Sequence, residues 1–266
     1  CKILNIKRNY FYDVVSKNVG VSARKFIKLV KKSGIKIGKE NIFISSGKKM
    51  LPAIIEISPS FAFFLGLWLA EGSYNKEHVV RLSLNESEAK DIIDLCVKLF
   101  GNVSIYRKKG LGIDIYISSK PLVVLMKLLG FKDGARRKEI QKIVFNFSEE
   151  NLASFLRGYF SGDGSVYLNQ HKSVTIEASS VSKKLLDDLL YSLLYFGIVA
   201  KVHGNRILIT GAENLLRFLK IGFIQSEKNQ KIIEYLRRVK WTRSIQLPIN
   251  EVIIKEFPEW KDCKTI

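Results

Sequence analysis

With 266 residues, 47% of them hydrophobic, the chain is long enough for one large or two ordinary domains and has the composition of a globular protein rather than a disordered one. Lysine and arginine number 44 against 25 acidic residues, and the formal net charge of +19 favours a polyanionic partner, above all nucleic acid. The most apolar stretch, residues 57–70, is too short to cross a bilayer, and no secretory signal is visible. We therefore expect a cytoplasmic or organellar-matrix protein that is neither secreted nor membrane-bound.

Residues 1–57 form a basic N-terminal extension, with 13 lysines and arginines and 3 acidic residues. Residues 14–27 have the pattern of a helix, a turn at Gly20 and a second helix capped by Ser22, which resembles a helix-turn-helix. It would present Arg24 and Lys25 to DNA. A basic helical pair packed on the main domain fits the same residues equally well.

An internal repeat organises the rest of the chain. Residues 64–73 and 156–165 share one pattern, and their acidic residues, Glu71 and Asp163, lie 92 positions apart (163 − 71). Each segment is followed by an alternating strand (Val79–Leu84 and Val174–Ser179), a helix (86–99 and 182–195), a hairpin (103–117 and 199–210) and a short helix (122–129 and 215–219).

Both copies then reach a Gly-Phe pair, and its Phe lies 60 residues beyond the acidic residue in each (131 − 71 and 223 − 163). We therefore predict two α+β halves, residues 58–147 and 148–240, followed by a tail at 241–266. Because the tail contains Trp241, Phe257 and Trp260, we expect it to pack rather than to be disordered.

The two repeated segments are predicted to end two helices that pack on each other. Ser58-Pro59 and Ser148 provide N-terminal caps, and Gly72 and Gly164 provide the conformational freedom of a C-terminal cap. Small residues four positions apart on one helical face allow close backbone approach. These residues are Gly66 and Ala70 in the first helix and Gly158 and Gly162 in the second.

This packing would place Glu71 and Asp163 side by side. An acid at a helix C-terminus opposes the helix dipole, and neighbouring carboxylates repel each other, so the arrangement violates two stability rules and indicates function. A divalent metal would compensate, and carboxylate oxygens suit Mg²⁺, which also binds phosphate oxygens. The chemistry expected of such a centre is phosphodiester hydrolysis.

The paired motifs resemble the LAGLIDADG family of homing endonucleases in its single-chain form, over residues 58–240. The resemblance implies an α+β fold of two pseudo-symmetric αββαββα halves whose antiparallel sheets form a saddle over the DNA major groove. It also implies a monomeric, intron-encoded enzyme that cuts both strands of a long asymmetric site with two or three Mg²⁺ ions, for which Mn²⁺ can substitute. The metal site would comprise Glu71 and Asp163 with the preceding Ala70 and Gly162. The sequence departs from the family pattern in having Glu in the first motif and Leu69 and Ser161 at the motif's first acidic position.

Similar enzymes place a basic residue near the metal, just after the short helix that ends each half. Aligning the two Gly-Phe pairs selects Arg136 and Lys228 for this role, with Lys132 and Lys138 as near neighbours. Outward strand positions and loop cations are the candidate DNA contacts, although a solvated strand face is the ordinary interpretation of any one of them. The candidates are Ser73, Tyr74, Lys76, Arg81, Ser83, Tyr106, Lys108, Lys109, Asp114 and Tyr116 in the first half, and Ser165, Tyr167, Lys172, Thr175, Glu177, Lys201, His203 and Arg206 in the second.

Alternative classes remain open on the residues alone. A maturase would bind the intron RNA that encodes it, and a non-cutting regulator would combine a degenerate core with the helix-turn-helix; the presence of both acids counts against the regulator. The three cysteines show no zinc or disulfide spacing. Cys1 suggests a protein-splicing residue, but no splicing block surrounds it and the chain does not end in His-Asn, so we interpret it as a boundary of a trimmed chain.

Overall fold

The computed structural model describes residues 43–46, 49–52, 56–86, 89–108, 112–169 and 173–239, together with residues 22, 25, 28, 31 and 32. The predicted helix-turn-helix at 14–27 lies outside the described residues except for Ser22 and Lys25, and the tail at 241–266 lies wholly outside them.

The described chain is an α+β protein in which the same order of elements occurs twice, as predicted. The first half consists of α3 (Pro59–Glu71), β3 (Gly72–Asn75), β4 (Val79–Leu84), α4 (Ala89–Phe100), β5 (Ser104–Lys108), β6 (Gly112–Ser118) and α5 (Lys120–Leu128). The second consists of α6 (Glu149–Asp163), β7 (Gly164–Leu168), β8 (Val174–Ser179), α7 (Lys183–Tyr195), β9 (Lys201–His203), β10 (Arg206–Ile209) and α8 (Ala212–Phe218). Each half is therefore αββαββα.

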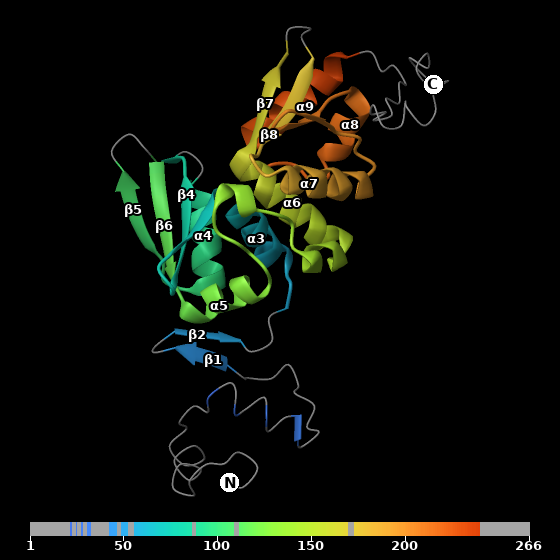
Figure 1. Ribbon diagram of the computed structural model, residues 1–266. Helices are drawn as coiled ribbons and strands as arrows, with labels where there is room; N and C mark the ends of the chain where they lie inside the picture. The colour runs from blue at the N-terminus through green and yellow to red at the C-terminus, as the bar shows by residue number, and fades with distance from the viewer. Residues whose placement is uncertain are drawn as a thin grey trace, which may run out of the picture.

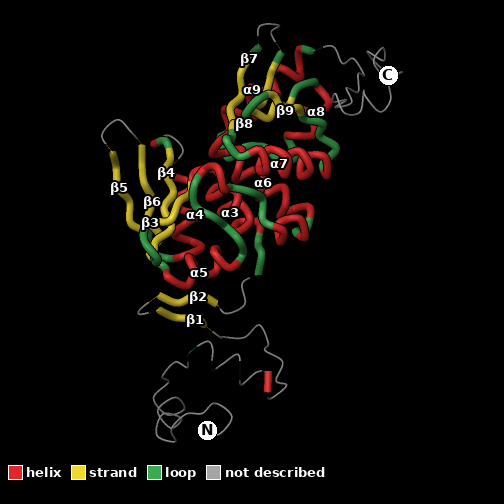
Figure 2. Tube along the Cα trace, viewed as in Figure 1, coloured by secondary structure: helices red, strands yellow, loops and turns green. Residues whose placement is uncertain are grey.

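Each half contains one antiparallel sheet of four strands. The strand order is β3-β4-β6-β5 in the first half and β7-β8-β10-β9 in the second, so equivalent strands occupy equivalent places. Figures 1 and 2 show α3 and α6 side by side at the centre, with one sheet on either side of the pair. The alternation predicted for the inner face is confirmed, because Val80, Leu82 and Leu84 of β4 are buried, as are Val174, Ile176 and Ala178 of β8.

Some elements were not expected from the sequence. A hairpin of β1 (Phe43–Ser46) and β2 (Lys49–Pro52), in the N-terminal extension for which no strand was predicted, lies against α5 (Figure 1). Helix α9 (Ser226–Arg238) follows α8; its sequence is mostly polar, and Ile232 is its buried residue. The segment between the halves contains the short 3₁₀ helices η2 (Ala135–Arg137) and η3 (Lys142–Asn146).

Backbone contact between α3 and α6 explains the repeated small residues. Ser58 and Ser148 cap the two helices as predicted, accepting hydrogen bonds from the backbone N–H groups of Phe61 and Asn151. A Cβ atom on Gly66 would lie 1.9 Å from the carbonyl oxygen of Phe155, and one on Gly158 would lie 2.1 Å from that of Phe63. Only glycine fits at either position. Residues 61–70 are buried on all sides of α3, because the helix lies between α6 and its own half.

Each helix ends at its predicted glycine, Gly72 or Gly164, but the special backbone conformation predicted for these residues is wrong. Their φ angles of −89° and −86° are open to any residue. The constraint is steric: a Cβ on Gly72 would lie 2.3 Å from the Trp68 ring, and one on Gly164 would lie 2.3 Å from the carbonyl oxygen of Phe160. At both helix ends the backbone passes close to the last helical turn and continues directly into the following strand, β3 or β7.

Candidate active site

The carboxyl ends of α3 and α6 meet, and each helix ends on an acidic residue, Glu71 and Asp163. Contact extends to the last turn, because a Cβ on Gly162 would lie 2.6 Å from the Ala70 Cβ and 3.0 Å from the Glu71 Cγ. The two acidic residues therefore lie at the same end of one helix pair.

Lys138, from the segment between the halves, brings a cation to this end. Its Nζ donates a hydrogen bond of 2.6 Å to the Ala70 carbonyl oxygen. Burial lowers the pKa of Lys138, and the negative charges of Asp163, Glu71 and Asp133 oppose this shift. Burial likewise raises the pKa of Asp163, and the charge of Lys138 and the Tyr159 hydroxyl oppose it. One ammonium group thus lies in the field of both carboxylates.

The two basic residues selected from the sequence occupy different positions. Lys228, on α9, reaches the end of the second helix, where its Nζ donates a hydrogen bond of 2.9 Å to the Gly164 carbonyl oxygen and lies 5.4 Å from the centre of the Phe223 ring. Arg136 is exposed on η2, and Lys138 instead makes the contact with α3. Counting from the acidic residue does not locate Lys138, because Lys228 lies 65 residues after Asp163 (228 − 163) and Lys138 lies 67 after Glu71 (138 − 71), whereas Arg136 lies 65 after it.

The donor set at the helix ends fits a hard divalent cation. The Lys138 ammonium group binds the Ala70 carbonyl oxygen and interacts electrostatically with the carboxylates of Glu71 and Asp163, so oxygen donors of three residues lie near one cation. Carboxylate and carbonyl oxygens are the ligands that Mg²⁺ and Ca²⁺ prefer. In the described part of the chain, no cluster of three or more His, Cys, Asp or Glu residues suggests a competing metal site.

Polar side chains on the first sheet are paired with one another. Arg81 Nε donates to Ser73 Oγ at 3.0 Å, while Ser83 Oγ and Tyr116 Oη donate to the two carboxylate oxygens of Asp114, at 2.7 and 3.2 Å. The prediction that Asp114 is exposed is therefore wrong, since it is only 1% exposed. Its neighbours on the adjacent strand and two residues along its own strand cover it. Tyr106, opposite Asp114 on β5, is 60% exposed.

The second sheet presents its polar groups more openly. Tyr167 Oη donates to Glu177 Oε2 at 2.8 Å, and an Arg206 guanidinium nitrogen lies 3.4 Å from the same oxygen. Ser165, Tyr167, Lys201, His203 and Arg206 are exposed, and Glu177 is partly so. Thr175, predicted to face outward, is buried.

The remaining candidates are divided between the interior, the surface and the undescribed residues. Tyr74 donates its hydroxyl to the Phe131 carbonyl oxygen and packs on Trp68, so it supports the core. Lys76 is exposed at a turn with a φ of 64°. Lys25 is partly exposed in a helical stretch. Arg24, Lys109 and Lys172 lie outside the described residues, and the side chain of Lys108 is not described.

None of the helices within the described ranges is long and apolar enough to span a lipid bilayer. Most of the apolar run at 57–70 lies in α3, whose residues 61–70 are buried.

Comparison with known proteins confirms the resemblance seen in the sequence. Residues 150–221, from α6 through α8, match the family of the LAGLIDADG-like domain. The chain is 33% identical over 74% of its length to an uncharacterised protein of Methanocaldococcus jannaschii and 29% identical over 79% to the replication factor C small subunit of that organism. It is 30% identical over 77% to a probable translation initiation factor of Thermococcus kodakarensis. The alignments span only 23%, 12% and 18% of these relatives, respectively.

Solved structures with a related chain path include the homing endonuclease I-WcaI bound to its DNA recognition sequence. The TM-score is 0.48 and the identity 16%, with 83% of this chain and 96% of that one covered. Full-length WhiA from Thermatoga maritima gives a TM-score of 0.47 at 18% identity, covering 77% of this chain and 67% of that one.

Proposed function

We propose that this chain, which carries a LAGLIDADG-like domain, is a site-specific double-stranded DNA endonuclease that hydrolyses one phosphodiester bond on each strand with Mg²⁺. The observation that carries the proposal is the meeting of α3 and α6 at Glu71 and Asp163, with Lys138 held between them. A buried cation and two carboxylates at converging helix ends, beside two sheets with exposed polar side chains, suit a polyanionic substrate.

The two acidic residues would hold divalent metal through their carboxylates, with Ala70 and Gly162 contributing backbone carbonyl oxygens. Metal bound there supplies charge neutralisation at the phosphate and a lowered pKa for an attacking water. The chain contributes geometry, because the close backbone contacts at Gly66 and Gly158 hold the two helices that carry the acidic residues against each other. Lys138 contacts the carboxyl end of α3 and Lys228 that of α6, and both would orient water or stabilise charge developing on phosphate oxygens.

The two sheets would bind one duplex, with one half-site each. The exposed Tyr106 of the first sheet and the exposed Lys201, His203 and Arg206 of the second provide donors for base edges and phosphates. Because the outward side chains differ between the halves, the preferred site should lack two-fold symmetry. A net charge of +19 predicts binding that weakens steeply as salt increases. A single chain supplies both halves, so we expect it to act as a monomer.

The relatives support a mobile module of this kind. Two of them are named for replication and for translation initiation, and the alignment covers less than a quarter of each relative. A DNA-cutting element that inserts itself into unrelated genes would produce this distribution.

Selection of cut products from a randomised duplex library, with and without Mg²⁺, tests the proposal. We expect one long asymmetric sequence, of roughly two turns of duplex, to be cut on both strands only when metal is present. Binding to a specific duplex without cutting in Mg²⁺ or Mn²⁺ would contradict the endonuclease assignment and favour a DNA-binding regulator.

A further inference from the structure

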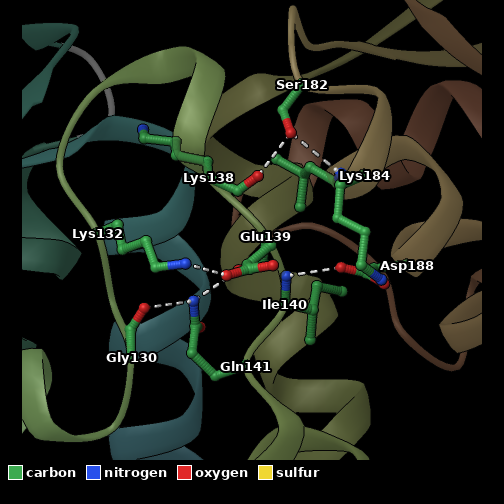
Figure 3. A network of polar contacts seen from close by, with 10 residues as sticks. Gly130, Lys132, Lys138, Glu139, Ile140, Gln141, Ser182, Lys184 and Asp188 are labelled. Atoms are coloured by element: carbon green, nitrogen blue, oxygen red, sulfur yellow. Dashed lines mark hydrogen bonds and ion pairs between the residues drawn. The ribbon is translucent and has the colours of Figure 1, made fainter.

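The segment joining the two halves makes specific contacts with α7 of the second half. Ile140 N donates a hydrogen bond of 3.1 Å to Asp188 Oδ2, and the Ser182 hydroxyl, which caps α7, donates one of 2.7 Å to the Lys138 carbonyl oxygen. Figure 3 shows these bonds reaching the joining segment from the side of the second half. The joining segment is thus hydrogen-bonded at Lys138 and at Ile140 to α7 and its N-cap residue.

Asp188 is an unusual residue for a packed helix face. Its side chain is 3% exposed, and a buried carboxylate is destabilising unless hydrogen bonds and an opposite charge compensate it. Lys184, one turn earlier and largely exposed, supplies the charge through an ion pair with Oδ1. The other carboxylate oxygen accepts the bond from Ile140, so the buried acid serves the joining segment.

Further contacts join the segment to itself. Lys132 Nζ contacts Glu139 Oε1 at 2.7 Å, and Gln141 Nε2 donates to the carbonyl oxygens of Gly130 and Glu139, at 3.4 and 2.6 Å (Figure 3). Lys138 lies between these contacts. Its carbonyl oxygen is bound by the second half, while its ammonium group is bound to Ala70 of the first.

We propose that Ser182 and Asp188 are positioning residues that place Lys138 at the end of α3, so that one half of the protein aligns the cation used in the other half's centre. The inference deepens the proposed endonuclease function and depends on it. Because Lys138 contacts the end of α3 and Lys228 the end of α6, losing the position of Lys138 should slow cleavage of one strand more than the other. General loss of stability would slow both strands alike.

The test is strand-resolved single-turnover cleavage, at saturating protein, of a duplex that the unaltered chain selects from a randomised library. Asp188→Leu leaves the Ile140 N–H without its acceptor and should slow the strand affected in Lys138→Met by about tenfold or more, so that nicked duplex accumulates. Asp188→Asn keeps an acceptor oxygen and should restore most of the rate.

Ser182→Ala removes a helix cap as well as the bond to Lys138, so Ser119→Ala, which removes the cap of α5 without touching the joining segment, is its matched control. Only Ser182→Ala should shift the strand ratio. The double variant Lys138→Met with Asp188→Leu should cut no more slowly than Lys138→Met alone, because both changes remove the same contribution.

Equal slowing of both strands in Asp188→Leu, or additive losses in the double variant, would overturn the positioning role while leaving the endonuclease intact. If the unaltered chain cuts no duplex, the proposed function fails instead. A crystal structure of Asp188→Leu then decides the structural part: Lys138 Nζ displaced from the Ala70 carbonyl oxygen supports the inference, and Lys138 Nζ in place contradicts it.

Discussion

A lysine contacts the carboxyl end of α3 and another contacts that of α6, but the two lysines come from different kinds of segment. Lys138 comes from the segment between the halves, held by Ser182 of the other half, whereas Lys228 comes from α9 and contacts Gly164 within its own half. The two halves have the same order of elements, but the basic residues at their helix ends come from different elements. Repetition of a fold therefore fixes where the acids lie, while the connections that follow each repeat decide which basic residue reaches them.

The largest expected effect comes from what the halves share. Glu71→Gln or Asp163→Asn should reduce cleavage of both strands by about 10³-fold or more, because each variant removes a charge that holds metal at the joint centre. Duplex affinity should be retained. Single-turnover cleavage and a gel-shift titration measure the two quantities, and unchanged cleavage in either variant would separate that acid from the centre.

Packing of α3 on α6 should depend on both glycines to a similar degree. Gly66→Ala or Gly158→Ala should lower the free energy of unfolding by about 3 kcal/mol, because the added Cβ meets a backbone carbonyl oxygen of the partner helix that cannot move aside. Denaturant unfolding checks this, with Ser154→Ala on α6 as the control. A stable Gly158→Ala protein would show that the backbones are farther apart than described.

The unequal lysines provide the sharpest contrast between the halves. Lys138→Met and Lys228→Met should each reduce cleavage by about 10²-fold, on opposite strands, because each ammonium group lies at a different helix end. Strand-specific end labels distinguish the two. Slowing of the same strand by both variants would mean that one centre uses both cations. Arg136→Met, at the exposed position selected from the sequence, should leave both rates within about twofold.

The two sheets should differ in stability rather than in rate. Asp114→Ala should cost about 1–3 kcal/mol, because it leaves the partly buried hydroxyls of Ser83 and Tyr116 without their acceptor. Glu177→Ala, which breaks partly exposed contacts with Tyr167 and Arg206, should cost less than about 1 kcal/mol. Thermal unfolding measures both. Equal costs would show that the second sheet is as closely paired as the first.

Much of this arrangement could be predicted from the sequence, because each copy of the repeat could be checked against the other. Matched spacing from each acid to its Gly-Phe pair located the helices and strands, and the small residues of α3 and α6 indicated backbone contact. Their Cβ clearances bear this out. The alternation of β4 and β8 likewise identified the buried faces, since strand periodicity depends on burial of one side.

The features that were missed depend on tertiary context. Helix α9 is mostly polar, but Ile232 is buried and Tyr235 and Leu236 pack against the core, a helical spacing that the prediction overlooked. Asp114 follows the outward pattern of its strand, yet its neighbours cover it, which alternation does not reveal. Choosing Arg136 over Lys138 assumed that the chain after each Gly-Phe pair takes the same path, whereas one copy forms η2 and a joining segment and the other enters α9.

Location of bound manganese tests the central claim most directly. A crystal of the protein with its selected duplex, grown in Mn²⁺ and measured at the manganese absorption edge, should show anomalous density between the carboxylates of Glu71 and Asp163, against the scissile phosphates. Density bound elsewhere, or carboxylates turned into separate surroundings with the duplex in place, would contradict the account.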